Sequence, residues 1–175
     1  MNFFITGKPG IGKTTFVRNI IAQTNLQWAG FYTQEIRENK SRIGFEIISL
    51  NGETGFLAHV NHHSKFRFGK YKVSLYDLET VGVAAIERAL MERKPILIDE
   101  IGKMELISDK FKTVVKRALT ASQVVLGTIT MANLSFVNQI KRRTDVIIAE
   151  LTADNRKILH TMIIDFLQEQ GIKYV

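Results

Sequence analysis

Apolar residues occur along the chain in two alternating patterns, short continuous runs and longer stretches with helical spacing. Short runs are typical of buried strands, and apolar residues three and four positions apart are typical of amphipathic helices. The runs predict strands at 3–5, 96–100, 124–130 and 145–150. The spaced stretches predict helices at about 79–92, 134–141 and 153–169, with two more following a glycine-rich stretch and Ser108. Such alternation predicts an α/β protein with a mainly parallel sheet and helices on both faces.

The region after the first helix departs from this alternation. The first helix is expected to end near residues 24–25, and strands are predicted at 31–37, 42–50 and 54–60. Asn51-Gly52 favours a tight hairpin between the last two of these strands. We therefore predict an antiparallel insert at about 30–60, followed by a region at 61–76 that is mostly loop. The whole chain, 1–175, is expected to form one domain.

Two of the later helices carry end signals. Ser108 is a candidate N-cap for a helix whose apolar face is Phe111, Val114, Val115, Ala118 and Leu119. Thr152 is the expected N-cap of the last helix, and Gly171 its C-terminal stop. The predicted inner face of that last helix is Ile158, Leu159, Met162, Ile163, Phe166 and Leu167.

Composition narrows the function classes. The absence of cysteine excludes disulfides, thiolate catalysis and cysteine-ligated zinc. No apolar run reaches the roughly 20 residues that a spanning helix needs, and a strand in the first few residues leaves no room for a signal peptide. We expect a cytoplasmic monomer that is not attached to a membrane. The net charge of +7 suits phosphate-rich ligands and also suits an inert basic surface.

The glycine-rich loop, residues 7–14 with the sequence GKPGIGKT, matches G-x-x-x-x-G-K-[ST] between a predicted strand and a predicted helix. Glycines let the backbone aim successive N–H groups inward, which makes an anion nest at a helix N-terminus. We expect Lys13 to contact the β and γ phosphates and to act in catalysis, the Thr14 hydroxyl to ligate Mg²⁺, and Thr15 to reach the α phosphate. The candidate phosphate-binding residues are Gly7, Lys8, Pro9, Gly10, Ile11, Gly12, Lys13, Thr14 and Thr15.

A second signal is the strand ILIDE, which ends in two acids. Its Asp99 is expected to reach the Mg²⁺ shell, through water. Its Glu100 is the candidate catalytic residue that orients water for attack on the γ phosphate, with an ordinary surface acid as the alternative. Parallel sheets bind ligands at the C-terminal ends of their strands, where both acids are predicted to lie.

Several residues keep more than one interpretation. Thr128 or Thr130 is either a contact to the attacking water or γ phosphate or a core threonine. A cation that stabilises the transition state is sought among Lys103, Arg142, Arg143 and Arg156, and spacing does not choose between them.

Three further segments are also open. The turn at 150–156 either caps a helix or abuts the nucleobase, if its strand neighbours the first strand. His59, His62 and His63 are interpreted as loop residues rather than metal ligands. The segment 65–72, KFRFGKYK, is interpreted as partly buried aromatic residues under a cationic loop, with a single-stranded nucleic-acid platform as the alternative.

The chain resembles a family of small nucleoside-triphosphatases first recognised in thermophilic microbes, which has a human relative called the cancer-related nucleoside-triphosphatase. The resemblance covers nearly the whole chain. It rests on TGKPGIGKTT at 6–15, GFYTQEIRE at 30–38, RIGFEIISL at 42–50, GKYKVSL at 69–75, LIDEIGKMEL at 97–106 and TADNR at 152–156.

The resemblance implies a RecA-like P-loop fold and slow, metal-dependent hydrolysis of several nucleoside triphosphates, including ATP, GTP, CTP and UTP, with weak base discrimination. It also implies a second nucleotide-facing segment made of Leu97, Ile98, Asp99, Glu100, Ile101, Gly102, Lys103 and Met104. Two other functions fit the same scaffold. One is a nucleotide or small-molecule kinase; the other is an NTP-dependent nucleic-acid-binding module, although nucleic acid is not the favoured partner.

Overall fold

The computed structural model describes all 175 residues and contains one sheet of nine strands. The strands are β1 (Asn2–Thr6), β2 (Ala29–Glu38), β3 (Ser41–Ser49), β4 (Thr54–His59), β5 (Arg67–Phe68), β6 (Tyr71–Val73), β7 (Ile96–Ile101), β8 (Val125–Ile129) and β9 (Val146–Glu150). Their spatial order is β5-β6-β4-β3-β2-β7-β8-β1-β9. β2, β7, β8, β1 and β9 pair in parallel, so their C-terminal ends meet at one edge.

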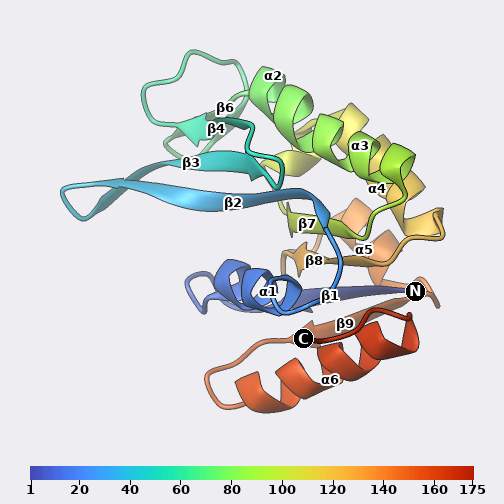
Figure 1. Ribbon diagram of the computed structural model, residues 1–175. Helices are drawn as coiled ribbons and strands as arrows, with labels where there is room; N and C mark the ends of the chain where they lie inside the picture. Colours follow the sequence, from blue (N-terminus) through green and yellow to red (C-terminus); the bar gives the residue numbers. More distant parts are fainter.

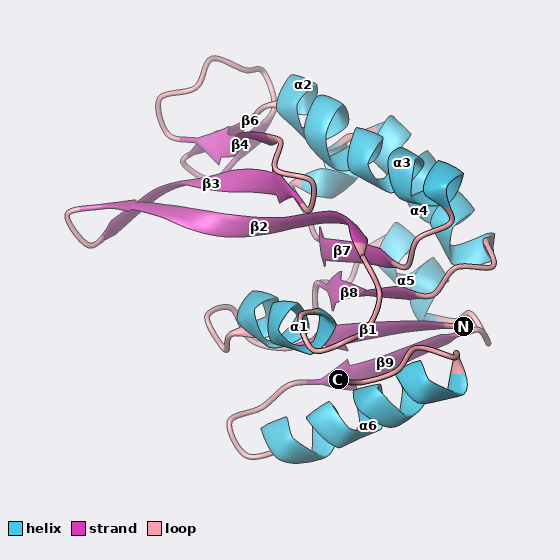
Figure 2. Ribbon diagram, viewed as in Figure 1, coloured by secondary structure: helices cyan, strands magenta, loops and turns pink.

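Helices cover both faces of the sheet, as predicted (Figure 2). The helical elements are α1 (Lys13–Ile21), α2 (Leu75–Asp77), η1 (Leu78–Val83), α3 (Ala84–Glu92), η2 (Glu105–Ile107), α4 (Asp109–Thr120), α5 (Ser135–Lys141) and α6 (Arg156–Glu169). One hydrophobic cluster joins α1 and α6 to one face of the sheet, and a larger cluster joins α3, α4 and α5 to the other. No helix combines the length and the apolar composition needed to cross a bilayer.

The antiparallel part of the sheet runs further along the chain than the predicted 30–60. β3 pairs with β2 and β4 (Figure 1), and β6 pairs with β4 and β5. Most of 61–76 is loop, as predicted, but Arg67–Phe68 and Tyr71–Val73 form short strands, and Tyr71 and Val73 are buried in the larger cluster beside β4. The turn predicted at Asn51-Gly52 is confirmed, with Gly52 at φ 96°.

Two helix starts differ from the sequence prediction. The helical stretch predicted from 79 begins at Leu75, because the Ser74 side chain caps it by accepting a hydrogen bond from the Asp77 N–H, and residues 78–83 continue it as a π-helix. α6 begins at Arg156 rather than 153, with Asn155 in place of Thr152 at the N-cap position. The Thr152 N–H instead donates to Asn155 Oδ1 at 2.8 Å, which closes the turn before the helix.

Two further helix features differ, and two are confirmed. α1 ends at Ile21, earlier than expected, because the N–H groups of Gln23 and Thr24 donate to carbonyls three residues back, to Ile20 and Ile21, and no longer continue the α-helical pattern. On α6, Ile158 and Met162 are 66% and 46% exposed, so the predicted inner face was too wide. α6 packs the stripe of Leu159, Ile163 and Phe166 onto the sheet, where Phe166 meets Phe3 of β1 with ring centroids 5.4 Å apart, and Ile158 and Met162 lie outside that stripe. The Ser108 cap of α4 and the stop at Gly171, with φ 80°, are confirmed.

Candidate active site

The glycine-rich loop connects β1 to α1 at the C-terminal edge of the sheet (Figure 1). Gly12 stands at the N-cap of α1 with φ 93°, a left-handed conformation that side chains other than glycine rarely adopt. A Cβ added to Gly7 would lie 2.8 Å from the Leu151 carbonyl oxygen, so the loop packs directly on the turn that follows β9. The first-turn N–H groups of α1 have no intrahelical partners, which makes this end of the helix suited to an anion.

The Lys13 ammonium lies over the glycine-rich loop and donates to the carbonyls of Gly7 at 3.1 Å and Lys8 at 3.3 Å. The Lys13 charge also lowers the pKa of both Asp99 and Glu100 against the effect of their burial. The structure therefore brings together the two segments that the sequence analysis predicted to share a site.

Asp99 is 1% exposed at the C-terminal end of β7. The Thr128 hydroxyl donates to Oδ1 of this carboxylate from β8, whereas Oδ2 is buried without a hydrogen-bond partner. Burial raises the pKa of Asp99, and the hydroxyls of Thr128 and Thr14, the backbone of Thr33 and the charge of Lys13 oppose that rise. Thr128 is therefore a buried core threonine whose hydroxyl is used by Asp99. The Thr130 hydroxyl accepts a hydrogen bond from the Ala132 N–H instead.

These oxygens suit Mg²⁺. A hard cation prefers carboxylate and hydroxyl oxygens, and Mg²⁺ usually takes only one or two ligands from the protein and the rest from phosphates and water. The unpartnered Asp99 Oδ2, with the Thr14 hydroxyl close enough to affect the pKa of Asp99, fits that demand.

Glu100 follows Asp99 across a cis peptide bond and is half-buried. Burial raises the pKa of Glu100, the charge of Lys13 lowers it, and the neighbouring Asp99 raises it. Glu100 therefore faces the same lysine as Asp99 and keeps partial access to solvent, which is the placement expected of a residue that orients water.

Glu105, at the start of η2, was missed by the sequence analysis. It is 5% exposed, and a Cβ placed on Gly102 would lie 2.8 Å from Glu105 Oε2 and 3.1 Å from Glu100 Oε1, so the two carboxyl groups flank the same glycine. Burial and the nearby charge of Glu100 hold the pKa of Glu105 well above its ordinary value. The signal in the sequence was an acid inside the apolar stretch MELI, beyond the segment that ended at Met104.

The rest of the segment 97–104 divides into core and surface. Side chains that were expected to contact nucleotide are buried in the two hydrophobic clusters because successive residues of β7 point to opposite faces of the sheet; these are Leu97, Ile98, Ile101 and Met104. These buried side chains support the end of β7, and contact between the segment 97–104 and nucleotide stays a prediction. Lys103 is exposed, with its Nζ 5.6 Å from the centre of the Phe68 ring on β5.

The candidate cations separate by position. Arg143 pairs with Asp145 at 2.7 Å and donates to the Leu119 carbonyl, and Arg142 caps the C-terminus of α5, so both lie at the sheet edge opposite the glycine-rich loop. Arg156, at the start of α6, donates instead to the carbonyl of Ile11 within the loop.

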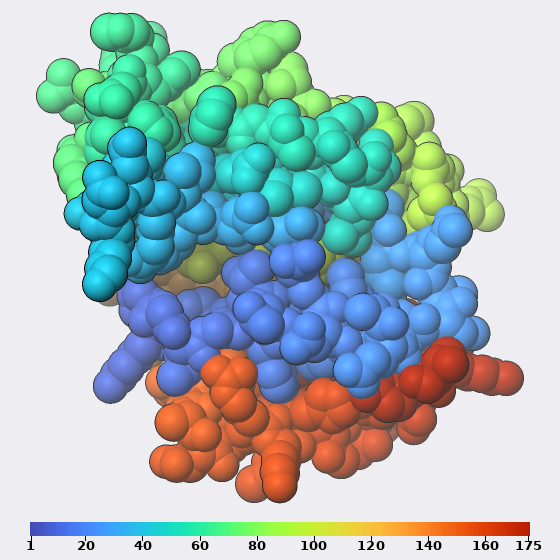
Figure 3. Space-filling model, turned by 60° about the vertical axis from the view of Figure 1, so that its left-hand side comes forward, coloured from blue at the N-terminus to red at the C-terminus, as the bar shows by residue number.

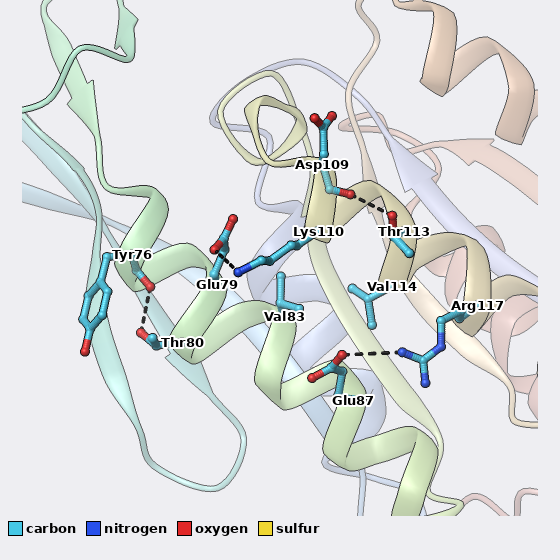
Figure 4. Close-up of a pocket in the computed structure, with 10 residues that line it drawn as sticks. All are labelled: Tyr76, Glu79, Thr80, Val83, Glu87, Asp109, Lys110, Thr113, Val114 and Arg117. Atoms are coloured by element: carbon cyan, nitrogen blue, oxygen red, sulfur yellow. Dashed lines mark hydrogen bonds and ion pairs between the residues drawn. The ribbon is translucent and has the colours of Figure 1, made fainter.

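The site opens into a hollow on the surface. Figure 3 shows this hollow between the β2–β3 hairpin above and the dark-blue glycine-rich loop below, with olive atoms from the middle of the chain at its floor. A separate groove of about 670 Å³ lies between η1–α3 and α4 (Figure 4). None of its lining residues belongs to 7–15 or 97–104, and its charged groups pair with one another, as Lys110 does with Glu79 and Arg117 with Glu87.

Comparison with known proteins gives consistent matches. A family model described as "NTPase" matches residues 2–164. The nucleoside-triphosphatase THEP1 of Thermotoga maritima is 46% identical over 96% of each chain. The crystal structure of THEP1 from Aquifex aeolicus superimposes with a TM-score of 0.87 at 35% identity, covering 96% of this chain and 99% of that one. The solution structure of a human cancer-related nucleoside triphosphatase gives 0.81 at 33% identity, covering 96% and 97%.

Proposed function

The chain belongs to the NTPase family, and we propose that it hydrolyses nucleoside triphosphates at the γ phosphate, giving the diphosphate and inorganic phosphate. It is a nucleoside-triphosphatase, a hydrolase with the fold of its P-loop relatives. The observation that carries the proposal is the convergence of Lys13 with Asp99 and Glu100 at one sheet edge.

Different residues of the chain bind the phosphates, hold the metal ion and orient the attacking water. The loop amides and Lys13 bind the β and γ phosphates, and Asp99 with Thr14 would hold Mg²⁺. When bound, Mg²⁺ neutralises charge that develops on the phosphate oxygens. Thr128 fixes the Asp99 carboxylate, leaving Oδ2 for the ion. Glu100 orients a water molecule in line with the bond between the γ phosphorus and the bridging oxygen, and that bond breaks as the water oxygen attacks.

The proposed substrates are ATP, GTP, CTP and UTP, with little choice between bases. A kinase would transfer the phosphate to an organic acceptor, and the comparisons give no support to a kinase or to a nucleic-acid-binding module. Of the aromatic residues in 65–72, Tyr71 is buried and Phe66 packs on the core, which leaves only Phe68 as an exposed ring for stacking on a base. The cytoplasmic location and the monomeric state stay predictions.

The test is phosphate release from the four triphosphates, with and without Mg²⁺ and with no acceptor added. Glu100→Gln should still bind nucleotide but lose turnover by about 10²-fold or more, because the amide no longer accepts a proton from water. Lys13→Ala should weaken both binding and turnover, because its charge contacts the phosphates before and during reaction. As a matched control, Glu150→Gln changes an exposed acid at the end of β9 and should retain full turnover.

Release that requires an added acceptor would contradict hydrolysis. Unchanged turnover in Glu100→Gln would remove Glu100 from the mechanism while leaving the phosphate site in place.

A further inference from the structure

The order of the strands determines on which side of the glycine-rich loop the nucleoside of a bound nucleotide lies; this inference rests on the proposed function. Asp99 and Glu100, which handle the γ phosphate and its metal, stand at the end of β7. The glycine-rich loop follows β1, and β9 lies on the far side of β1 from β7 and β8. With the γ phosphate held on the β7 side, the α phosphate and the nucleoside must leave the loop on the opposite side, toward β9 and α6.

The β9–α6 turn is built against the glycine-rich loop at two points. At the first point, a Cβ added to Gly7 would lie 2.8 Å from the Leu151 carbonyl oxygen. At the second, the Arg156 guanidinium donates to the Ile11 carbonyl. The turn is held in shape by Asn155, which accepts from the Thr152 N–H and donates to the Glu150 carbonyl at 2.7 Å. Figure 3 shows the orange atoms of this region directly beside the blue atoms of the loop and α1.

A shallow depression of about 430 Å³ lies between the first turns of α1 and α6. It is lined by Phe16, Arg156, Lys157, His160 and Thr161. The rings of Phe16 and His160 meet edge to face, with centroids 6.5 Å apart, and the Arg156 Cζ lies 5.9 Å from the centre of the Phe16 ring. Arg156 is exposed, so a ligand in the depression can reach its guanidinium.

We propose that the nucleobase of the bound nucleotide occupies this depression and stacks on the guanidinium of Arg156. A guanidinium plane stacks on the π face of any base, and stacking is tolerant of base identity because every base has such a face. The side chains of the depression are cationic, aromatic or hydroxyl-bearing; Phe16 is buried at its base, and Arg156, Lys157 and Thr161 are exposed. This chemistry favours binding of all four nucleosides.

A mirror-image position exists on the β2 side of α1. The Arg18 Cζ lies 3.9 Å from the centre of the Tyr32 ring, which makes another cation–aromatic pair, with Arg18 exposed and Tyr32 half-buried. The direction of the nucleotide argues against this pair as the base site, because it lies on the same side as β7. Arg18 therefore supplies a matched control for Arg156.

The experiment measures binding of ADP and of inorganic pyrophosphate by titration calorimetry in the presence of Mg²⁺. The two ligands carry the same number of phosphates and differ in the nucleoside, and neither has a γ phosphate to lose. Arg156→Ala should weaken ADP about tenfold and pyrophosphate less than twofold. Arg156→Lys should remain nearly as weak toward ADP, because the charge is kept but the stacking plane is lost. Arg18→Ala should change neither affinity by more than twofold.

Equal losses of ADP and pyrophosphate in Arg156→Ala would place Arg156 at the phosphates and overturn the inference. Unchanged ADP binding in Arg156→Ala, or full rescue by Arg156→Lys, would do the same. A selective loss of ADP in Arg18→Ala would put the base on the β2 side. Failure of the proposed function looks different, since the wild-type protein would then release no phosphate from any of the four triphosphates.

Discussion

Three carboxyl groups, those of Asp99, Glu100 and Glu105, gather where β7 ends and η2 begins. Burial raises the pKa of each one, and the Lys13 charge offsets that rise for Asp99 and Glu100. Glu105 has no cation within ion-pair distance, so its charged form is costly in the folded protein. The site therefore joins two carboxylates that can work as anions with a third that favours the protonated state.

Glu105 makes stability depend on pH in a defined direction. Its folded-state pKa lies well above the ordinary value of 4.5, so between those two values the folded protein binds more protons than the unfolded one. Its contribution to stability is complete below pH 4.5 and is lost as pH rises through the folded-state pKa. Glu105→Gln should remove this loss, so the variant gains stability over wild type at pH 8 but not at pH 4. Each unit of raised pKa is worth about 1.4 kcal/mol.

Urea unfolding of wild type and Glu105→Gln at both pH values measures this difference. Glu169→Gln, an exposed acid at the end of α6, is the control and should follow wild type at each pH. A difference between Glu105→Gln and wild type that is the same at pH 4 and pH 8 would show that the carboxyl group titrates normally in the folded protein.

At the scale of elements, the buried stripe of α6 is narrower than its apolar pattern predicts. Leu159, Ile163 and Phe166 are buried, while Ile158 and Met162 point to solvent on the same helix. A periodic apolar pattern marks which residues share a face, but the width of the buried stripe depends on what lies beneath it. α6 packs on β1 and β9, and because β9 is the last strand of the sheet, no further element covers the flank of α6 that carries Ile158 and Met162.

The same substitution at two positions of α6 tests this explanation. Ile163→Ala should lower the free energy of unfolding by about 2–5 kcal/mol, because a fully buried side chain leaves a cavity. Ile158→Ala should change it by no more than about 0.5 kcal/mol, since its side chain is 66% exposed. Chemical denaturation of both variants provides the comparison, and equal losses would mean that α6 buries the wider face that its sequence suggests.

At the scale of the whole molecule, the parallel order of the sheet assembles a site from distant parts of the chain. The glycine-rich loop follows β1, the acids end β7, and Arg156 opens α6 after β9. The ligand that spans these parts should bind only the folded protein and therefore stabilise it.

Saturation with ADP and Mg²⁺ should raise the melting temperature in proportion to the logarithm of ligand concentration. At about 100 times Kd the added stability is about 2.7 kcal/mol, which for a chain of this size is a rise of roughly 5–10 °C. Lys13→Ala should need much more ADP for the same rise, whereas Lys141→Ala, an exposed lysine at the end of α5, should behave as wild type. Scanning calorimetry over a series of ADP concentrations measures the slope. If the melting temperature does not change with ADP concentration, the C-terminal edge of the sheet does not bind the nucleotide.

Local sequence signals determined the glycine-rich loop, which is the proposed phosphate-binding half of the site, and most of the elements. Three signals act over only a few residues and can therefore be recognised in the sequence alone. They are the spacing of Gly7, Gly12 and Lys13, the two acids after an apolar strand, and the Ser108 cap. The covered parallel sheet followed from the alternation of strands and helices, because such strands must bury both faces.

The tertiary structure alone decided what depends on neighbours distant in sequence. It made strands of Arg67–Phe68 and Tyr71–Val73 by setting them beside β4, sent Leu97 and Ile98 into opposite clusters, and buried Glu105 next to Glu100. It also chose Arg156 over Arg142 and Arg143 as the cation beside the loop, by placing β9 next to β1. Burial and proximity are properties of the packed chain, and no local period encodes which surfaces meet.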